Sequence, residues 1–252
     1  MSIGGMLVDL SGVLYVGDKA LPGAHEALLR LREMDRPFRF VTNTSRQCRA
    51  EVMGRLHRMG LGVEPHEILT APLAGRRWIE ARGLRPHLLI HPELLPDFVG
   101  METSPSNAVF MGDAGETFAY GNLNAAFRVL QTGAPLIAVA RNRYFQESDG
   151  LSLDLGAFVA ALEFAARTEA VIVGKPSAEF YMAAVESMGL SPPEVLMVGD
   201  DLEADVLGAL DAGLQAALVR TGKYRSSDEA GLKGARATVF DNISELLEKV
   251  MK

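Results

Sequence analysis

The sequence predicts an α/β fold, namely a doubly wound, Rossmann-like parallel sheet with a second, smaller α/β domain inserted into it. Short apolar runs alternate with amphipathic stretches of helical period along the chain, as expected for parallel strands joined by helices. Several runs end in a carboxylate, hydroxyl or amide, where open sheets bind their ligands. The length of 252 residues exceeds one average domain but not two large ones, which fits a core with an insertion.

Composition narrows the possible classes of protein. The net charge is −7 and no long basic run occurs, which argues against nucleic acid or an anionic membrane as a partner. Cys48 is the only cysteine, so an intrachain disulfide is excluded and a reducing compartment is favoured. No basic segment precedes the first apolar run, and no stretch of about 18 apolar residues is present. We therefore expect a cytoplasmic protein without a signal peptide or a membrane span.

The first strand is expected over 5–8, because this short apolar run is typical of a buried strand. It ends at Asp9, and Gly12 allows a sharp turn beyond it. Asp9 alone could equally begin a turn, so a functional role for it depends on which groups occur further along the chain. The next elements expected are a turn-rich loop over 15–22, helices over 25–34 and 47–59, and strands over 38–41 and 67–70.

The strand over 38–41 leads into Thr42, Asn43, Thr44 and Ser45, just before a helix. Hydroxyls and backbone N–H groups at a helix start face the positive end of the helix dipole, which makes an anion cradle. Simple N-capping by Thr44 or Ser45 would explain the same residues and is compatible with that function.

A self-contained α/β module of about a hundred residues is expected over 73–173, between core segments 1–72 and 174–252. Its expected elements are helices over 73–82, 116–130 and 155–167, and strands over 88–90, 108–111, 136–140 and 171–173. The core then continues with helices over 178–188 and 203–212, strands over 195–198, 216–219 and 237–240, and a closing helix.

Polar groups from remote parts of the chain should converge, because a parallel sheet brings the carboxyl ends of its strands to one edge. Asp9 and Asp200 would form an oxygen-lined site suited to Mg²⁺. Asp205 lies four residues beyond Asp201 and could orient metal-bound water. Lys175 offers a compact positive charge to phosphate oxygens and to a nucleophile. Each feature alone is weak, but together with the Thr42 cradle they indicate phosphoryl transfer with an aspartate as covalent nucleophile.

These residues, in this order, resemble the four motifs of the haloacid dehalogenase (HAD) superfamily. The motifs are Asp9-Leu-Ser-Gly-Val, Thr42-Asn43, Lys175-Pro176, and Gly199-Asp200-Asp201 with Asp205. The insertion between the second and third motifs resembles the large α/β cap (type C2) of subclass IIA, which includes phosphoglycolate, nitrophenyl phosphate and nucleotide phosphatases. The resemblance covers essentially the whole chain and implies a HAD core with an α/β cap.

The resemblance also implies residue roles. Asp9 would be the nucleophile, and Mg²⁺ would be held by Asp9, the Ser11 carbonyl and Asp200. Asp201 and Asp205 would lie just outside the ion's ligands. The transferring phosphoryl group of a small phosphorylated substrate would be bound by the remaining groups: the N–H groups near Leu10 and Ser11, the Thr42 hydroxyl, the Asn43 backbone, and Lys175.

Ser11 departs from the family pattern, because most phosphatases of the superfamily carry a second aspartate there as general acid and base. Loss of a general acid typically costs roughly a hundred- to ten-thousand-fold in rate. Either the enzyme is poor, or it acts on leaving groups that need little protonation, such as pyrophosphate, phosphohistidine, phospholysine or aryl phosphates. We favour the second interpretation, because a branch of the family that the chain resembles carries the same serine and acts on such substrates.

The cap is expected to control specificity through Arg141, Asn142, Arg143 and Tyr144 and through the loop 150–156, although the arginines fit a solvated face equally well. Members of the subclass commonly dimerise through the cap, so a homodimer is possible on the resemblance alone. Thr221-Gly222-Lys223 follows a strand and could therefore touch the site, but a structural loop is the favoured interpretation.

Two other classes of function compete with a Mg²⁺-dependent phosphohydrolase. A catalytically weak phospho-ligand-binding or regulatory protein would explain Ser11. A receiver-type signalling domain also uses Asp, Thr, Lys and Mg²⁺, but it would be half this length, with its phosphoacceptor on a later strand.

Overall fold

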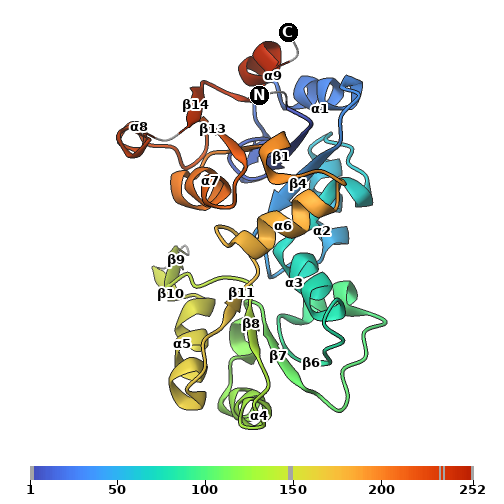
Figure 1. The fold of residues 1–252 in the computed structure, drawn as a ribbon, viewed down its shortest axis with the longest axis vertical. Helices are drawn as coiled ribbons and strands as arrows, with labels where there is room; N and C mark the ends of the chain where they lie inside the picture. Colours follow the sequence, from blue (N-terminus) through green and yellow to red (C-terminus); the bar gives the residue numbers. More distant parts are fainter. Residues whose placement is uncertain (1–2, 147–149, 233, 235, 251–252) are drawn as a thin grey trace. The chain divides into compact units, whose positions relative to one another are not determined.

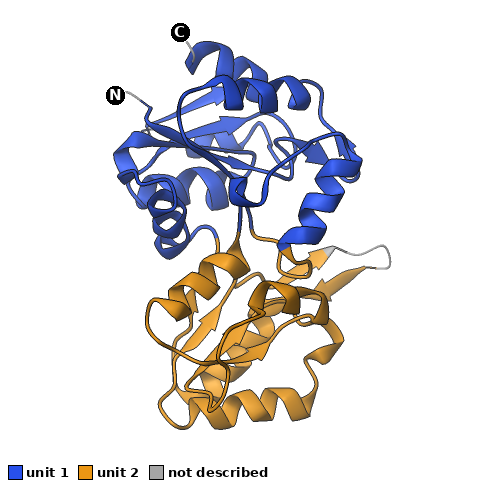
Figure 2. Cartoon of the chain, turned by 90° about the vertical axis from the view of Figure 1, so that its right-hand side faces the viewer, with its two compact units in different colours: residues 1–42, 49–69, 175–252 blue, residues 43–48, 70–174 orange. Residues whose placement is uncertain are grey.

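The computed structural model describes residues 3–146, 150–232, 234 and 236–250, and the chain forms two units (Figure 2). Unit 1 comprises residues 1–42, 49–69 and 175–252, and unit 2 comprises residues 43–48 and 70–174. The predicted domain limits at 72 and 173 remain a prediction. The short segment 43–48 belongs to unit 2 although it directly follows a strand of unit 1.

The sheet of unit 1 has six strands in the order β14-β13-β12-β1-β4-β5 (Figure 1). These strands are β1 (Gly5–Asp9), β4 (Phe38–Thr42), β5 (Ile68–Thr70), β12 (Val195–Gly199), β13 (Gln215–Val219) and β14 (Ala237–Phe240). β1 pairs in parallel with both β4 and β12, and β13 pairs in parallel with β12 and β14. The strand order reverses at β1, and such a switch point is where open α/β sheets bind ligands. The predicted fold class is confirmed.

Helices cover both faces of this sheet, which is why β1 and β12 are buried along their whole length and read as unbroken apolar runs. The helices of unit 1 are α1 (Ala24–Glu33), α2 (Arg49–Arg58), α6 (Ala178–Glu186), α7 (Gly208–Asp211), α8 (Asp228–Gly231) and α9 (Ile243–Val250). Met6, Val8 and Phe40 form one core cluster with buried residues of α1, α2 and α9. Leu7 alternates with Met6 and Val8 and so points to the other face of the sheet, outside this cluster.

Unit 2 has its own parallel sheet, in the order β11-β8-β7-β6. Its strands are β6 (Pro86–Leu89), β7 (Ala108–Met111), β8 (Leu136–Ala138) and β11 (Val171–Ile172), and its helices are α3 (Ala71–Glu80), α4 (Tyr120–Leu130) and α5 (Leu155–Ala166). β7 and β8 are fully buried. Within the described ranges, no helix is both long and apolar enough to cross a membrane.

The structure differs from the sequence-based expectation mainly in short elements. Two antiparallel pairs of short strands were not expected: β2 (Tyr15–Val16) with β3 (Lys19–Ala20), and β9 (Tyr144–Gln146) with β10 (Leu151–Leu153). Strands of two or three residues are too short to show an alternating pattern. The helix expected over 116–130 begins at Tyr120, after a 3₁₀ turn at Gly115–Thr117. The helix expected over 203–212 is a π-helix, Leu202–Leu207, followed by α7.

Glu67 ties the start of β5 to α1. The Arg32 guanidinium donates to both of its carboxylate oxygens, at 3.0 and 2.7 Å, and the Glu64 backbone N–H donates at 2.7 Å. Burial alone would raise the pKa of Glu67, but these hydrogen bonds outweigh it and lower the pKa. Glu67 therefore stabilises the fold in its ionised form.

Replacing Glu67 with glutamine should lower the free energy of unfolding by about 1.5–3 kcal/mol at neutral pH, because a hydrogen-bonded charge is lost. Since the folded-state pKa is depressed, the contribution is complete above the ordinary glutamate pKa and disappears as the pH falls through the folded-state value. Urea denaturation at several pH values measures both effects. Glu248→Gln, which removes an exposed pair with Arg30, should cost less than about 1 kcal/mol; equal losses in the two variants would contradict the assignment.

Candidate active site

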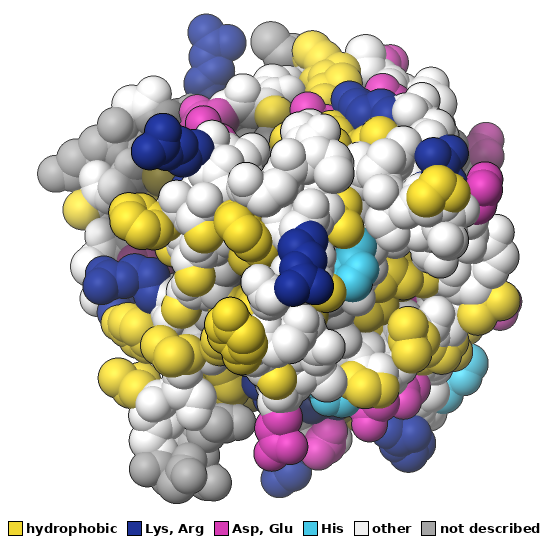
Figure 3. Space-filling view, turned by 90° about the horizontal axis from the view of Figure 1, so that it is seen from below, with side chains coloured by type: hydrophobic (Ala, Val, Ile, Leu, Met, Phe, Trp, Pro, Cys, Tyr) yellow, Lys and Arg dark blue, Asp and Glu magenta, His cyan; other side chains and the backbone are white. Residues whose placement is uncertain are grey.

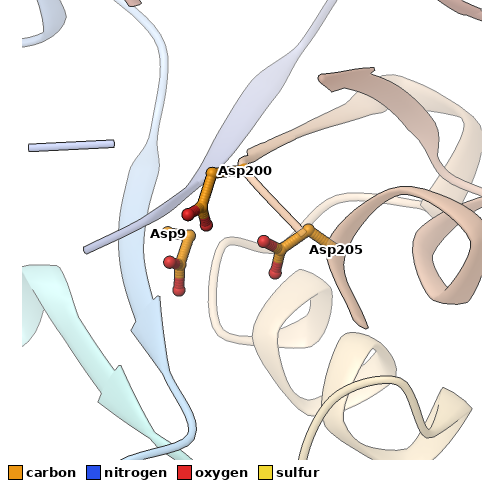
Figure 4. Close-up of side chains that lie close together, drawn as sticks. All are labelled: Asp9, Asp200 and Asp205. Carbon is orange, nitrogen blue, oxygen red and sulfur yellow. The ribbon is translucent and has the colours of Figure 1, made fainter. Parts of the chain in front are cut away.

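Three buried carboxylates converge at the carboxyl edge of the unit 1 sheet, at the switch point. Asp9 is the last residue of β1, and Asp200 directly follows β12, which pairs with β1. Asp205 lies in the π-helix that begins at Leu202. Figure 4 shows that the three side chains lie close together, and one oxygen from each lies within 4.8 Å of the others. The parallel topology accounts for the meeting of Asp9 and Asp200, which lie at the ends of neighbouring strands.

Lys175 places a buried ammonium between two of these carboxylates. Its Nζ atom lies 2.5 Å from Asp9 Oδ1 and 2.6 Å from Asp205 Oδ1. Burial alone would lower the pKa of Lys175, but the charges of Asp205 and Asp9 raise it above its ordinary value. The lysine therefore remains charged, and it offsets part of the cost of burying the carboxylates.

Asp9 is poised between its protonated and ionised forms. Burial raises the pKa of its carboxyl group to about 7, against the lowering effect of Lys175 and with further raising by Asp205 and Asp200. A strongly perturbed carboxyl group beside a specific cation is a common property of functional sites. Burial also raises the pKa of Asp200, so both acids would gain from an additional positive charge.

The π-helix sets the position of Asp205. The Asp201 carbonyl accepts hydrogen bonds from the N–H groups of both Asp205 and Val206, at 3.0 and 3.3 Å. The Asp201 side chain caps this helix by accepting from Glu203 N and Ala204 N. The two oxygens of Asp205 are occupied, one by Lys175 and the other by the Asp201 N–H at 3.2 Å. Asp205 is therefore arranged to hold Lys175.

The predicted phosphate cradle is divided between the units. Leu10 is buried and Ser11 is exposed in the turn after β1, and Gly12 has a φ of +89° that glycine adopts readily. Thr42 ends β4 and is buried. Asn43 belongs to unit 2, where its Oδ1 atom lies 2.9 Å from the position that a Cβ at Gly174 would take. Unit 1 thus brings together Asp9, Lys175, Asp200 and Asp205, and Thr42 ends the strand that pairs with β1.

The loop after β13, which the sequence made a less favoured candidate for contact with the site, contacts Asp200. The Lys223 backbone N–H donates to Asp200 Oδ2 at 2.6 Å, and the Thr221 hydroxyl donates to the Gly12 carbonyl at 2.5 Å. The favoured interpretation as a structural loop was incomplete. The signal in the sequence was the place of these residues directly after a strand of the core sheet.

The segment 43–48 packs against unit 2 through contacts that no sequence motif predicted. Arg46 Nε lies 2.6 Å from Asp113 Oδ2, and its guanidinium lies 4.7 Å from the centroid of the Phe145 ring. Asp113 N also donates to Ser45 Oγ at 3.3 Å. Arg46, Asp113 and Phe145 contribute to a cavity of about 560 Å³ in unit 2 that also includes the rings of Phe118 and Phe158.

The cap residues singled out from the sequence lie together in unit 2. Arg141, Arg143 and Tyr144 contribute to a cavity of about 480 Å³. Arg141 forms ion pairs with Glu163 and, at 4.0 Å, with Glu169, so its charge is already balanced. The Asn142 carbonyl accepts from Gly156 N at 2.9 Å, which joins the two segments expected to face the substrate.

The donor set fits a hard divalent cation. Carboxylate oxygens are the ligands that Mg²⁺ prefers, usually one or two of them together with water. Across the described parts of the chain, Asp9, Asp200 and Asp205 are the one group of three or more acidic, histidine or cysteine side chains close enough to share an ion. Asp205 accepts hydrogen bonds through both of its oxygens, from Lys175 and from the Asp201 N–H, whereas Lys175 binds Asp9 through Oδ1. Asp9 and Asp200 are therefore the side chains suited to direct coordination.

Comparison with known proteins agrees with this fold. Residues 6–96 match the family described as haloacid dehalogenase-like hydrolase, and residues 172–246 match the family described as HAD-hydrolase-like. The human haloacid dehalogenase-like hydrolase domain-containing protein 2 is 48% identical over 89% of this chain and 86% of that protein. The phospholysine phosphohistidine inorganic pyrophosphate phosphatase of Xenopus laevis is 46% identical over the same shares.

Solved structures show the same fold across the chain. The 4-nitrophenylphosphatase of Thermotoga maritima superimposes with a TM-score of 0.85 at 28% identity, covering 98% of this chain and 97% of that one. The p-nitrophenyl phosphatase of Archaeoglobus fulgidus gives a TM-score of 0.88 at 25% identity, covering 99% and 100%.

These matches define the class of protein as a HAD-fold hydrolase with a cap domain. The chain belongs to the haloacid dehalogenase-like hydrolase family. Within that family it is an enzyme of the phosphatase type, and the resemblance predicted from the four motifs is confirmed.

The affinity for Mg²⁺ should depend on pH, because the cation and a proton compete for Asp9. Below its pKa of about 7, Asp9 must lose a proton before it binds a cation, so the affinity should fall by about tenfold per pH unit and level off above that value. Titration calorimetry between about pH 5.5 and 8.5 measures this dependence. Asp9→Asn should show weaker binding with a shallower dependence, and a wild-type affinity that is constant over this range would contradict the prediction.

Proposed function

We propose that this enzyme is a Mg²⁺-dependent phosphohydrolase that works through an aspartyl-phosphate on Asp9. The observation that supports the proposal most directly is the Lys175 ammonium 2.5 Å from Asp9 Oδ1, with Asp200 on the neighbouring strand. A carboxylate nucleophile, a fixed cation and a second carboxylate for a metal ion are the groups that phosphoryl transfer requires. All of them lie at the switch point of one sheet.

The Asp9 carboxylate would attack phosphorus, and the bond from phosphorus to the leaving group would break. Water would then cleave the acyl-phosphate, which releases phosphate and restores Asp9. Lys175 would favour the ionised form of Asp9 and hold it in position. The Thr42 hydroxyl, the Asn43 backbone and the N–H groups near Leu10 and Ser11 would bind the phosphoryl oxygens. Fixed donors of this kind stabilise developing charge without reorganising during the reaction.

Asp9, the Ser11 backbone carbonyl and Asp200 would hold Mg²⁺, with Asp201 and Asp205 outside its direct ligands. When bound, the ion would offset the negative charge of the phosphoryl group next to the carboxylates. Asp205 would act through Lys175, to which it is bound at 2.6 Å.

Ser11 directs the choice of substrate. Its hydroxyl cannot serve as an acid or base near neutral pH, so the enzyme should favour leaving groups that need little protonation. Pyrophosphate, phosphoramidates such as phosphohistidine and phospholysine, and aryl phosphates meet this requirement. The name of the Xenopus laevis relative includes phospholysine, phosphohistidine and inorganic pyrophosphate, which supports the same group of substrates.

Specificity from Arg141, Asn142 and Tyr144, dimerisation through the cap and a cytoplasmic location remain predictions. The exposed apolar side chains of unit 2, among them Tyr120 of α4 and Phe164 of α5, support self-association, because exposed apolar groups gather at interfaces. Figure 3 shows many hydrophobic side chains on one face of the molecule, with few acidic groups among them.

Replacing Asp9 with asparagine should abolish Mg²⁺-dependent phosphate release, because the amide is not a nucleophile toward phosphorus. Phosphate release from nitrophenyl phosphate, pyrophosphate and phosphohistidine measures the effect, with Asp211→Asn as an exposed carboxylate control in the same unit. If wild type binds phosphate but releases none above the Asp9→Asn background, the chain is instead a phospho-ligand-binding protein, the alternative that Ser11 favours.

Replacing Ser11 with aspartate should raise the rate on alkyl phosphates by about a hundred- to ten-thousand-fold, since it supplies the missing general acid. Pyrophosphate should gain much less, because its leaving group needs less help. Ser11→Asn is the matched control of similar size without an acid. Steady-state rates on both substrates test the idea, and equal gains on the two would show that Ser11 does not determine leaving-group preference.

A further inference from the structure

We propose that Thr221, Gly222 and Lys223 form a positioning loop for the metal site, which holds Asp200 so that it offers one oxygen to the cation. The proposal rests on the proposed function, because it takes Asp200 and the Ser11 carbonyl as magnesium ligands. It concerns residues outside the four motifs. We call residues 221–223 the positioning loop.

The first contact of the positioning loop occupies one oxygen of Asp200. The Lys223 backbone N–H donates to Oδ2 at 2.6 Å, and a hydrogen bond to an ionised carboxylate is of the stronger, charge-assisted kind. Asp200 is only 2% exposed, so water does not readily replace this donor. The other oxygen, Oδ1, remains for the cation.

The second contact fixes the turn that carries the other proposed ligand. The Thr221 hydroxyl donates to the Gly12 carbonyl at 2.5 Å. Gly12 directly follows Ser11, so this hydrogen bond restrains the peptide next to the Ser11 carbonyl. One short loop therefore restrains both the turn after β1 and the carboxylate after β12.

Two glycines allow this close approach. A Cβ at Gly222 would lie 2.0 Å from Asp200 Oδ2 and 2.4 Å from Gly12 Cα, and a Cβ at Gly12 would lie 1.9 Å from the same oxygen. Both glycines have positive φ, +60° at Gly222 and +89° at Gly12. The backbone at Gly12 and the backbone at Gly222 therefore both lie against the Asp200 carboxylate, and neither position has room for a side chain.

The positioning loop is itself held at both ends. Arg220 N donates to Phe240 O at 2.9 Å, and the Arg220 guanidinium binds Glu229 and Asp241 at 2.8 and 2.7 Å. The Tyr224 hydroxyl donates to Glu229 at 2.7 Å. Side chains that hold a ligand accurately need such support behind them.

This arrangement favours Mg²⁺ over Ca²⁺. Mg²⁺ requires near-ideal octahedral geometry with few carboxylate oxygens, whereas Ca²⁺ takes six to eight oxygens and accepts bidentate carboxylates. With Oδ2 bound by the positioning loop, Asp200 can give only one oxygen. A displaced loop would leave Asp200 able to turn and bind through both.

The experiment measures the affinities of the full-length chain for Mg²⁺ and Ca²⁺ by titration calorimetry. Gly222→Ala should weaken Mg²⁺ binding by about ten- to a hundredfold, the usual effect of losing support behind a metal ligand, and should reduce the preference for Mg²⁺ over Ca²⁺. Gly189→Ala is the matched control, because Gly189 has a φ of +69° and no atom within 4 Å of its would-be Cβ. It carries the same backbone strain without the contact.

Thr221→Val and Thr221→Ser provide a second pair that does not depend on how well Gly222→Ala folds. Valine removes the donor to Gly12 at nearly constant shape and should weaken Mg²⁺ binding by about tenfold, while serine keeps the hydroxyl and should retain wild-type affinity. Wild-type affinity in Thr221→Val, or equal Mg²⁺ affinity in Gly222→Ala and Gly189→Ala, would overturn the role of the positioning loop and leave the proposed function intact. Absence of Mg²⁺ binding in wild type would overturn both.

Discussion

The buried ammonium of Lys175, held between Asp9 and Asp205, is the interaction on which the rest of the site depends. Taking several charges out of water costs several kcal/mol per ion even after relaxation, so each group is tolerated only because the others are present. The three residues come from β1, the segment before α6 and the π-helix after β12. The fold must therefore bring these elements together before any of the three charges is compensated, and the central strands provide that meeting point.

Main-chain atoms, more than side chains, pack directly against these buried carboxylates. A Cβ at Gly199 would lie 2.2 Å from Asp205, and Gly12 and Gly222 approach Asp200 in the same way. Glycine leaves room for a carboxylate to lie directly against the main chain, where N–H groups can bind it. Rigid main-chain donors hold their geometry more accurately than long side chains, which lose rotamer freedom when fixed.

Much of the fold could be predicted from the sequence, because buried parallel strands read as apolar runs and end in polar groups at one edge. The meeting of Asp9 and Asp200 follows from that rule, whereas Lys175 and Asp205 reach them from the segment before α6 and from the π-helix. The hairpins β2–β3 and β9–β10 could not be predicted, since strands so short have no period. The inclusion of residues 43–48 in unit 2 depends on the contact of Arg46 with Asp113, between positions far apart in the sequence. The contact of Lys223 with Asp200 could not be predicted either, because it uses a backbone N–H, which every residue except proline has.

The π-helix after β12 has a consequence for how the chain can vary. Successive side chains of an α-helix are rotated by about 100° around the helix axis. The wider π-helical turn therefore changes the direction in which the side chains after Asp201 point, compared with an α-helix. A chain with one residue fewer here could form an ordinary α-helix, but Asp205 would then point away from Lys175. Length, and not only residue identity, is therefore constrained between β12 and α7, and this stretch should tolerate substitution at exposed positions more readily than any insertion or deletion.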